Sequence, residues 1–213
     1  MKLFRRKDKP AHAARPEPAE LASRFWQGWA DVLPEVSAAL GDREPQRVEN
    51  QLCDLVAALH PELHFSLERG QRAIYALVIS GQEDPRLRSY TDAWRAAAPA
   101  EDAIWEYHDS VPPVPDPTQV TVNLGAHRIP LADVRVVAQV DGDVVDVAVY
   151  HPEMAALEPA ARDAMTYLPL DAALGERLAA EHLRRVETAD TEPADTIGLM
   201  ELRTLVQDLA KSD

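Results

Sequence analysis

The chain has 213 residues, of which 46% are hydrophobic, so it can fill the core of one large domain or of two small ones. It contains no apolar run of the roughly 20 residues that a membrane-spanning helix needs, and its charged N-terminus lacks the apolar segment of a secretory signal. Its one cysteine, Cys53, excludes an internal disulfide framework and favours a cytoplasmic location.

The net charge of -14 is unevenly distributed along the chain. Residues 1–24 carry seven Lys and Arg against three acidic residues, so this segment is near +4 and the remainder near -18. An acidic body repels phosphate backbones, and nucleic-acid binding by the folded part is therefore not expected. The leader could contact an anionic membrane surface weakly, or its charges could simply be solvated. Its cations are Lys2, Arg5, Arg6, Lys7 and Lys9.

The first half of the chain is predicted to place helices before strands. Residues 1–18 are rich in Pro, Ala and charge, which predicts a disordered leader. Helical and alternating apolar spacings then follow, and Pro34 is expected to bend or end the first helix. The expected elements are helices over 19–36, 43–60 and 85–98, and strands at 63–70, 73–80 and 103–109.

The second half opens after a proline-rich segment, residues 112–117, which suits a crossing between two β-rich stretches. Two β-branched runs flank Asp141-Gly142, a pair typical of a type I′ hairpin turn. Asp171 is expected to cap a helix. The expected elements are a β-rich stretch at 119–131, a hairpin at 134–152, helices over 153–164, 172–181 and 197–212, and strands at 165–170 and 182–188.

This order predicts an α+β fold, a mainly antiparallel sheet with helices packed on one face. The order strand, strand, helix, strand occurs at 63–109 and again at 131–170, which allows either a ferredoxin-like sheet or a duplicated ββαβ unit. The predicted organisation is a leader (1–18), a single domain (19–188) with halves at 19–110 and 118–188, and an acidic linker with a terminal helix (189–213).

Two strand ends combine an aromatic residue with a histidine. Glu106 and His108 share one face of their strand, since strand residues two apart point the same way. A carboxylate can make such a histidine a base, and His151 would join it if the two strands are neighbours. Polar residues that face water or cap loops are the alternative interpretation. Neither a nucleophile nor a phosphate-binding glycine loop is evident, so no cofactor is expected.

Metal binding is not predicted. His60 and His64 are four residues apart, a spacing that serves a metal only on a helix. Pro61 removes His60 from helical geometry.

The terminal helix carries an apolar stripe with spacings of three, four and three residues. The stripe could dock on the chain's own sheet or on a partner or second subunit. Its residues are Leu199, Leu202, Val206 and Leu209.

Four short motifs together resemble an uncharacterised bacterial family of domain-of-unknown-function type. They are "FWQGWADVL", "AAPAEDAIWEYHDSVPP", "DVAVYHP" and "YLPLDAALGE". The resemblance spans roughly residues 23–188. It implies an N-terminal Phe-Trp helix before a sheet and a Leu174-Gly175-Glu176 segment after a late strand. It also implies a compact cytoplasmic α+β domain without an established activity. The predicted topology is also similar to ribonuclease-inhibitor-type regulators, an analogy of fold alone.

These observations predict a non-enzymatic cytoplasmic protein that binds or regulates a protein partner. A hydrolase that uses His108 and His151 is the first alternative, and a membrane-surface adaptor that uses the basic leader is the second. The partner and the oligomeric state are left open.

Overall fold

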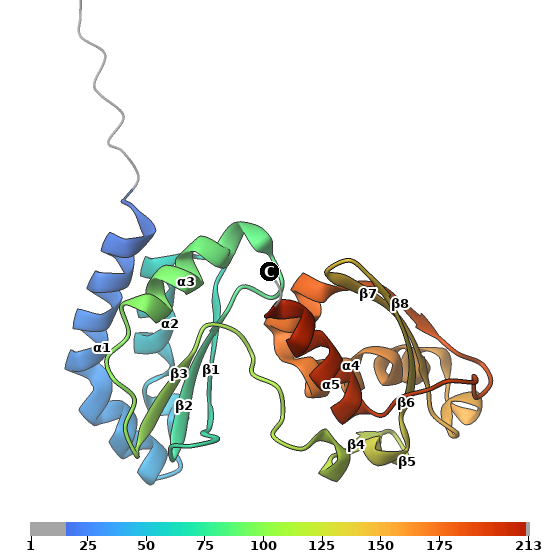
Figure 1. Ribbon diagram of the computed structural model, residues 1–213. Coiled ribbons are helices and arrows are strands. Elements are labelled where there is room, and N and C mark those ends of the chain that lie inside the picture. Colours follow the sequence, from blue (N-terminus) through green and yellow to red (C-terminus); the bar gives the residue numbers. More distant parts are fainter. Residues whose placement is uncertain (1–15, 212–213) are drawn as a thin grey trace, which may run out of the picture.

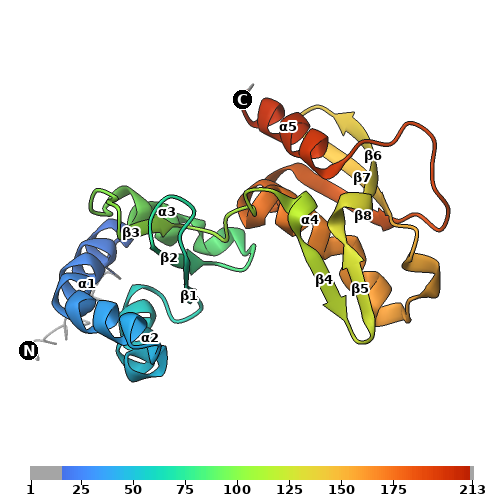
Figure 2. The ribbon, with the colours of Figure 1, turned by 90° about the horizontal axis from the view of Figure 1, so that it is seen from below.

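The computed structural model describes residues 16–211, which form two halves joined by the proline-rich linker (Figure 1). The leader cations lie outside the described residues. In the first half, three helices cover one face of a three-stranded sheet (Figure 2). Its elements are α1 (Pro18–Gly41), α2 (Glu49–Leu59), β1 (His64–Arg69), β2 (Tyr75–Ser80), α3 (Arg88–Ala96) and β3 (Trp105–His108).

The second half contains a two-stranded hairpin, a second three-stranded sheet and two helices. Its elements are β4 (Thr121–Leu124), β5 (His127–Pro130), β6 (Arg135–Asp141), β7 (Val144–Tyr150), α4 (Pro159–His182), β8 (Leu183–Thr188) and α5 (Leu199–Ala210). No helix within residues 16–211 is long and apolar enough to cross a membrane.

The α+β class is confirmed, but the strands do not share one sheet. Strand order is β1-β2-β3 in the first half and β6-β7-β8 in the second. In each half the first pairing is antiparallel and the second is parallel. The expected ββαβ order is therefore present twice, as two separate sheets and not as one ferredoxin-like sheet.

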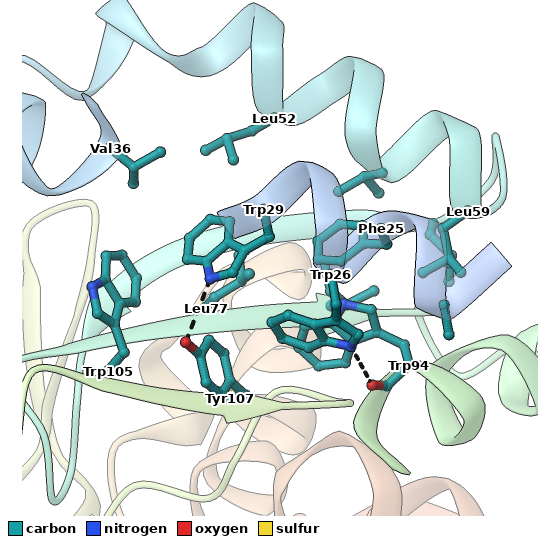
Figure 3. Packing of buried hydrophobic residues seen from close by; sticks show 14 of the residues in the cluster. Phe25, Trp26, Trp29, Val36, Leu52, Leu59, Leu77, Trp94, Trp105 and Tyr107 are labelled. Atoms are coloured by element: carbon teal, nitrogen blue, oxygen red, sulfur yellow. Dashed lines mark hydrogen bonds between the residues drawn. The ribbon is translucent and has the colours of Figure 1, made fainter. Parts of the chain in front are cut away.

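The first core is built from aromatic rings (Figure 3). Trp26 stacks on Trp94 with ring centroids 4.8 Å apart, and Trp29 meets Trp105 edge-on at 5.1 Å. The indole Nε1 of Trp26 donates to the carbonyl of Trp94 at 2.8 Å, so one polar atom is satisfied inside the apolar layer. All four tryptophans of the chain lie in this half, and their fluorescence therefore reports on this half alone.

The second core is separate from the first and includes the terminal helix. Leu199, Leu202 and Val206 are at most 2% exposed there, and Leu209 packs against the same cluster. An antiparallel bridge between Val136 and Ile197 ties the segment before α5 to β6. The stripe therefore packs in cis and is not a partner surface. The predicted single domain with a detached terminal helix is replaced by two cores, and the second includes α5.

Local predictions succeeded where turn chemistry was explicit and failed inside α4. The hairpin is confirmed: Asp141 pairs with Val144, and Gly142 takes φ 67° at the turn. The strand predicted at 165–170 is wrong, because those residues belong to α4. Asp171 therefore lies within a helix and does not cap one. The last strand of the second repeat is β8, which pairs in parallel with β7.

Candidate functional site at the junction of the halves

The linker between β3 and β4 lies against an interruption of α4. Gly175 has φ 71° and ψ 170°, so the helical backbone is broken at this residue. The freed amide of Glu176 donates instead to the carbonyl of Val111 at 2.9 Å. A β-carbon at position 175 would lie 2.7–2.8 Å from atoms of Val111 and Pro113. Only glycine allows this approach, so the Leu-Gly-Glu segment marks the junction of the halves.

The side chain of Glu176 joins three segments through one carboxylate. Its Oε1 accepts from the backbone N–H of Glu83 at 3.0 Å, and its Oε2 accepts from that of Val111 at 2.9 Å. Gln82 and Glu83 have φ values of 50° and 65°, so the loop after β2 is held in an unusual conformation beside α4. These two hydrogen bonds of the Glu176 carboxylate, to Glu83 and Val111, are called the clasp below. The clasp links the first half, the linker and the second half.

Ion pairs continue this contact along the second section of α4. Arg177 Nη2 lies 2.7 Å from a carboxylate oxygen of Asp92 and 2.9 Å from one of Asp109, both in or just after the first half. Arg88 at the start of α3 pairs with Glu181. Partly exposed pairs contribute little free energy each, so their main effect is to fix the orientation of α4 against α3.

Arg203 on α5 gathers backbone carbonyls from the linker and from α4. Its Nε donates to Ala173 O at 2.6 Å, and its Nη1 donates to Pro115 O at 2.9 Å. Its Nη2 donates to Val114 O and Ala172 O. The guanidinium therefore satisfies acceptors exposed by the break in α4. Burial lowers the pKa of Arg203, and the charge of Asp116 opposes that shift.

Replacing Arg203 with lysine should lower the free energy of unfolding by about 2 kcal/mol, because a compact ammonium cannot reach carbonyls that a planar fork spans. Urea unfolding followed by circular dichroism measures this loss. The matched control is Arg185→Lys, at a 65% exposed side chain that pairs with Glu187. The control should change stability by no more than about 0.5 kcal/mol. Equal effects of the two variants would contradict the structural role of Arg203.

A cleft of about 490 Å³ lies between β1 and α4 beside the clasp. Its lining comes from the start of β1, the end of β2, the following loop, the linker and α4. These residues are His64, Phe65, Ser66, Ser80, Gln82, Glu83, Val111, Asp171 and Glu176. In Figure 1, β1 is on the side of its sheet that faces the second half. The cleft therefore exists only because the two halves are held together.

Among the described residues, those that line the cleft include three carboxylates and no Lys or Arg. The Glu176 carboxylate accepts two backbone hydrogen bonds, whereas the side chains of Glu83 and Asp171 make no hydrogen bond or ion pair with residues 16–211. Although Asp171 is exposed, desolvation by the surrounding wall raises its pKa, and the charges of Glu83 and Glu176 raise it further. The site therefore favours a cationic group, which would relieve this repulsion.

The predicted pair of Glu106 and His108 does come together, at 3.0 Å between Glu106 Oε1 and His108 Nε2. Glu106 is 1% exposed and also accepts from the backbone N–H groups of Gln71, Arg72 and Ala73 at 2.7–3.0 Å. Burial opposes its ionisation, but the hydrogen bonds from His108 and the three amides outweigh burial and lower its pKa to about 2. This carboxylate holds the β1–β2 turn and has its oxygens occupied.

The third predicted residue, His151, lies in a different sheet region with different partners. Its Nε2 lies 3.1 Å from Pro130 O, and its Nδ1 accepts from Glu153 N at 3.1 Å. A neutral ring with the proton on Nε2 satisfies both contacts. His151 follows β7 whereas His108 ends β3, and neither lines the cleft. The structure does not bring the two imidazoles into one site.

Residues 16–211 contain no group of three or more His, Cys, Asp or Glu arranged to bind a metal.

Sequence reasoning missed the cleft because its lining comes from segments about one hundred residues apart. The Gln82-Glu83 turn and the polar outer face of β1 are the only local signals for it.

Comparisons of the chain with protein-family models, characterised protein sequences and solved structures found no match. The resemblance to an uncharacterised bacterial family therefore stays a prediction.

Proposed function

We propose that the protein is a non-enzymatic, cytoplasmic protein-binding or regulatory module and that the cleft between β1 and α4 receives its partner. The observation that carries this proposal is the placement of a 490 Å³ cleft with unpaired carboxylates where both halves meet. Two partly independent cores joined by a clasp are a common basis for binding between lobes.

Glu106 and His151, two of the residues considered for catalysis, have structural roles, and this favours a binding protein over an enzyme. Glu106 uses its carboxylate to hold a turn, and His151 uses both ring nitrogens to hold β5 and the segment after β7. A general base needs a free lone pair within reach of a substrate, and these contacts occupy the lone pairs. The cleft, in contrast, holds the carboxylates of Glu83 and Asp171, which have no partner among residues 16–211.

Photocrosslinking in the native cell tests this function. A photoreactive side chain at Ser66 inside the cleft should capture one discrete polypeptide, whereas the same group at Arg128, exposed on β5, should not. Replacing Glu83 with glutamine removes one negative charge from the cleft. This substitution should lower the yield of polypeptide crosslinked at Ser66 several-fold. Identical patterns from the two positions, or no polypeptide from Ser66, would contradict binding at the cleft.

A further inference from the structure

Strand β1 is an edge strand with an open outer side. Within residues 16–211 it pairs only with β2, in an unbroken register from His64↔Ser80 to Arg69↔Tyr75. Alternate residues of an edge strand present unpaired N–H and C=O groups outward. Proteins often block such edges with proline, bulges or charged side chains. Strand β1 has no proline and no bulge, and its two charged residues, Glu68 and Arg69, lie at its C-terminal end. The edge is therefore able to accept another strand.

Hollows flank this edge on both faces of the sheet. The cleft lies on one side, and a second hollow of about 410 Å³ lies on the other, between β1 and the α2 region. Both hollows are lined by Phe65 and Ser66, so they meet at the strand edge. Successive side chains of a strand point to opposite faces. A strand added to β1 would therefore send alternate side chains into the two hollows.

The two hollows differ in chemistry. The cleft presents the unpaired carboxylates of Glu83 and Asp171, with Glu176 beside them. The second hollow has polar and apolar lining in about equal parts, with Glu49 as its one acidic side chain. Its apolar residues are Pro45, Leu52, Phe65 and Leu67. One face thus suits Lys or Arg and the other suits aliphatic side chains.

We infer that the partner contributes an extended segment with alternating basic and apolar residues, which adds to β1 as a fourth strand of the first sheet. This inference rests on the proposed function and specifies its mode. Main-chain hydrogen bonds would supply affinity, and the alternate pockets would supply specificity. The negative charge of the cleft favours Lys or Arg at those positions of the partner segment that face it.

The test uses the full-length protein and a fluorescent peptide of about seven residues that alternates arginine and leucine. Fluorescence anisotropy should show saturable binding. The double variant Glu83→Gln/Asp171→Asn should weaken it at least about fivefold. The control Asp54→Asn/Glu192→Gln removes two exposed acidic charges outside both hollows and should leave affinity within about twofold. Equal losses in the two variants would overturn recognition by the cleft.

Backbone pairing is tested with two further peptides, N-methylated at every arginine or at every leucine. Because N–H groups alternate sides along a strand, only one series should lose binding, by about tenfold or more. Equal binding of both series would overturn strand addition. In that case crosslinking from Ser66 would still decide the proposed function separately. No binding of the parent peptide would likewise overturn the inference.

The same binding experiment also tests two other possible occupants of the β1 edge, the chain's own leader and a second copy of the chain. If Arg5→Gln/Arg6→Gln raises affinity for the peptide tenfold, the chain's own leader competes for the edge and the inferred partner is wrong. If the peptide converts a dimer into monomers in sedimentation, a second copy is the occupant and the inference is again overturned. Unchanged affinity in the leader variant and a monomer throughout are the results we expect.

Discussion

Replacing Gly175 with alanine is expected to lower the free energy of unfolding by about 3 kcal/mol or more. Gly175 has φ 71° and ψ 170°, a region of backbone space open almost only to glycine, which costs other residues about 1–3 kcal/mol. The added methyl would also meet Pro113 N and Val111 O at 2.7–2.8 Å. Overpacking against backbone atoms adds a further 1–3 kcal/mol. Guanidinium unfolding followed by circular dichroism measures the loss.

Gly142→Ala is the matched control for this prediction. Gly142 also has positive φ, 67°, but a β-carbon there would meet nothing within 4 Å. The Gly142→Ala variant should therefore lose only about 1 kcal/mol of its free energy of unfolding. If both variants lose the same amount, the close approach of the linker to α4 does not stabilise the junction, and the clasp description fails.

Replacing Glu106 with glutamine is expected to destabilise the first half by about 2–4 kcal/mol. One carboxylate oxygen accepts from Arg72 N and Ala73 N, and the other accepts from Gln71 N and contacts His108. An amide can present only one oxygen, so its NH₂ group must face backbone donors in either orientation. Leaving buried donors unpaired carries the full desolvation cost. Tryptophan fluorescence should report this loss, because every tryptophan lies in this half.

The same carboxylate should make the first half sensitive to acid. Its pKa in the folded protein is about 2, below the ordinary value of 4.5. The stabilisation is therefore complete well above pH 4.5 and is lost as pH falls through 4.5 to about 2, by about 3 kcal/mol in total. Glu68→Gln, at an exposed residue of β1, should leave this pH dependence unchanged. An equally acid-sensitive Glu106→Gln protein would contradict the assignment.

Most elements of the fold could be predicted because their local chemistry is explicit. The Asp141-Gly142 turn and the helical stripe of α1 are examples. The strand predicted at 165–170 is wrong because "MTYLPL" is apolar at both strand and helix spacing, and tertiary packing forms a helix there despite Pro169 in its interior. The division into two sheets could not be predicted, since strand pairing depends on which apolar faces meet.

The candidate site was predicted only in part, for a related reason. Glu106 and His108 are two residues apart on one strand, so their contact followed from strand geometry. His151 depended on sheet neighbours, and the structure places it with Pro130 and Glu153 instead. The resemblance singled out Leu174-Gly175-Glu176, and the role of the segment at the junction became evident only from its contacts with Val111 and Glu83.

Amide hydrogen exchange of the full-length protein, with and without the alternating arginine and leucine peptide, tests the central claim most directly. If the peptide adds to β1, outward amides within residues 64–69 should become at least about tenfold slower to exchange. Amides of β6, an edge strand of the second sheet, should not change. Protection confined to the second half, or none in β1 at saturating peptide, would contradict the account.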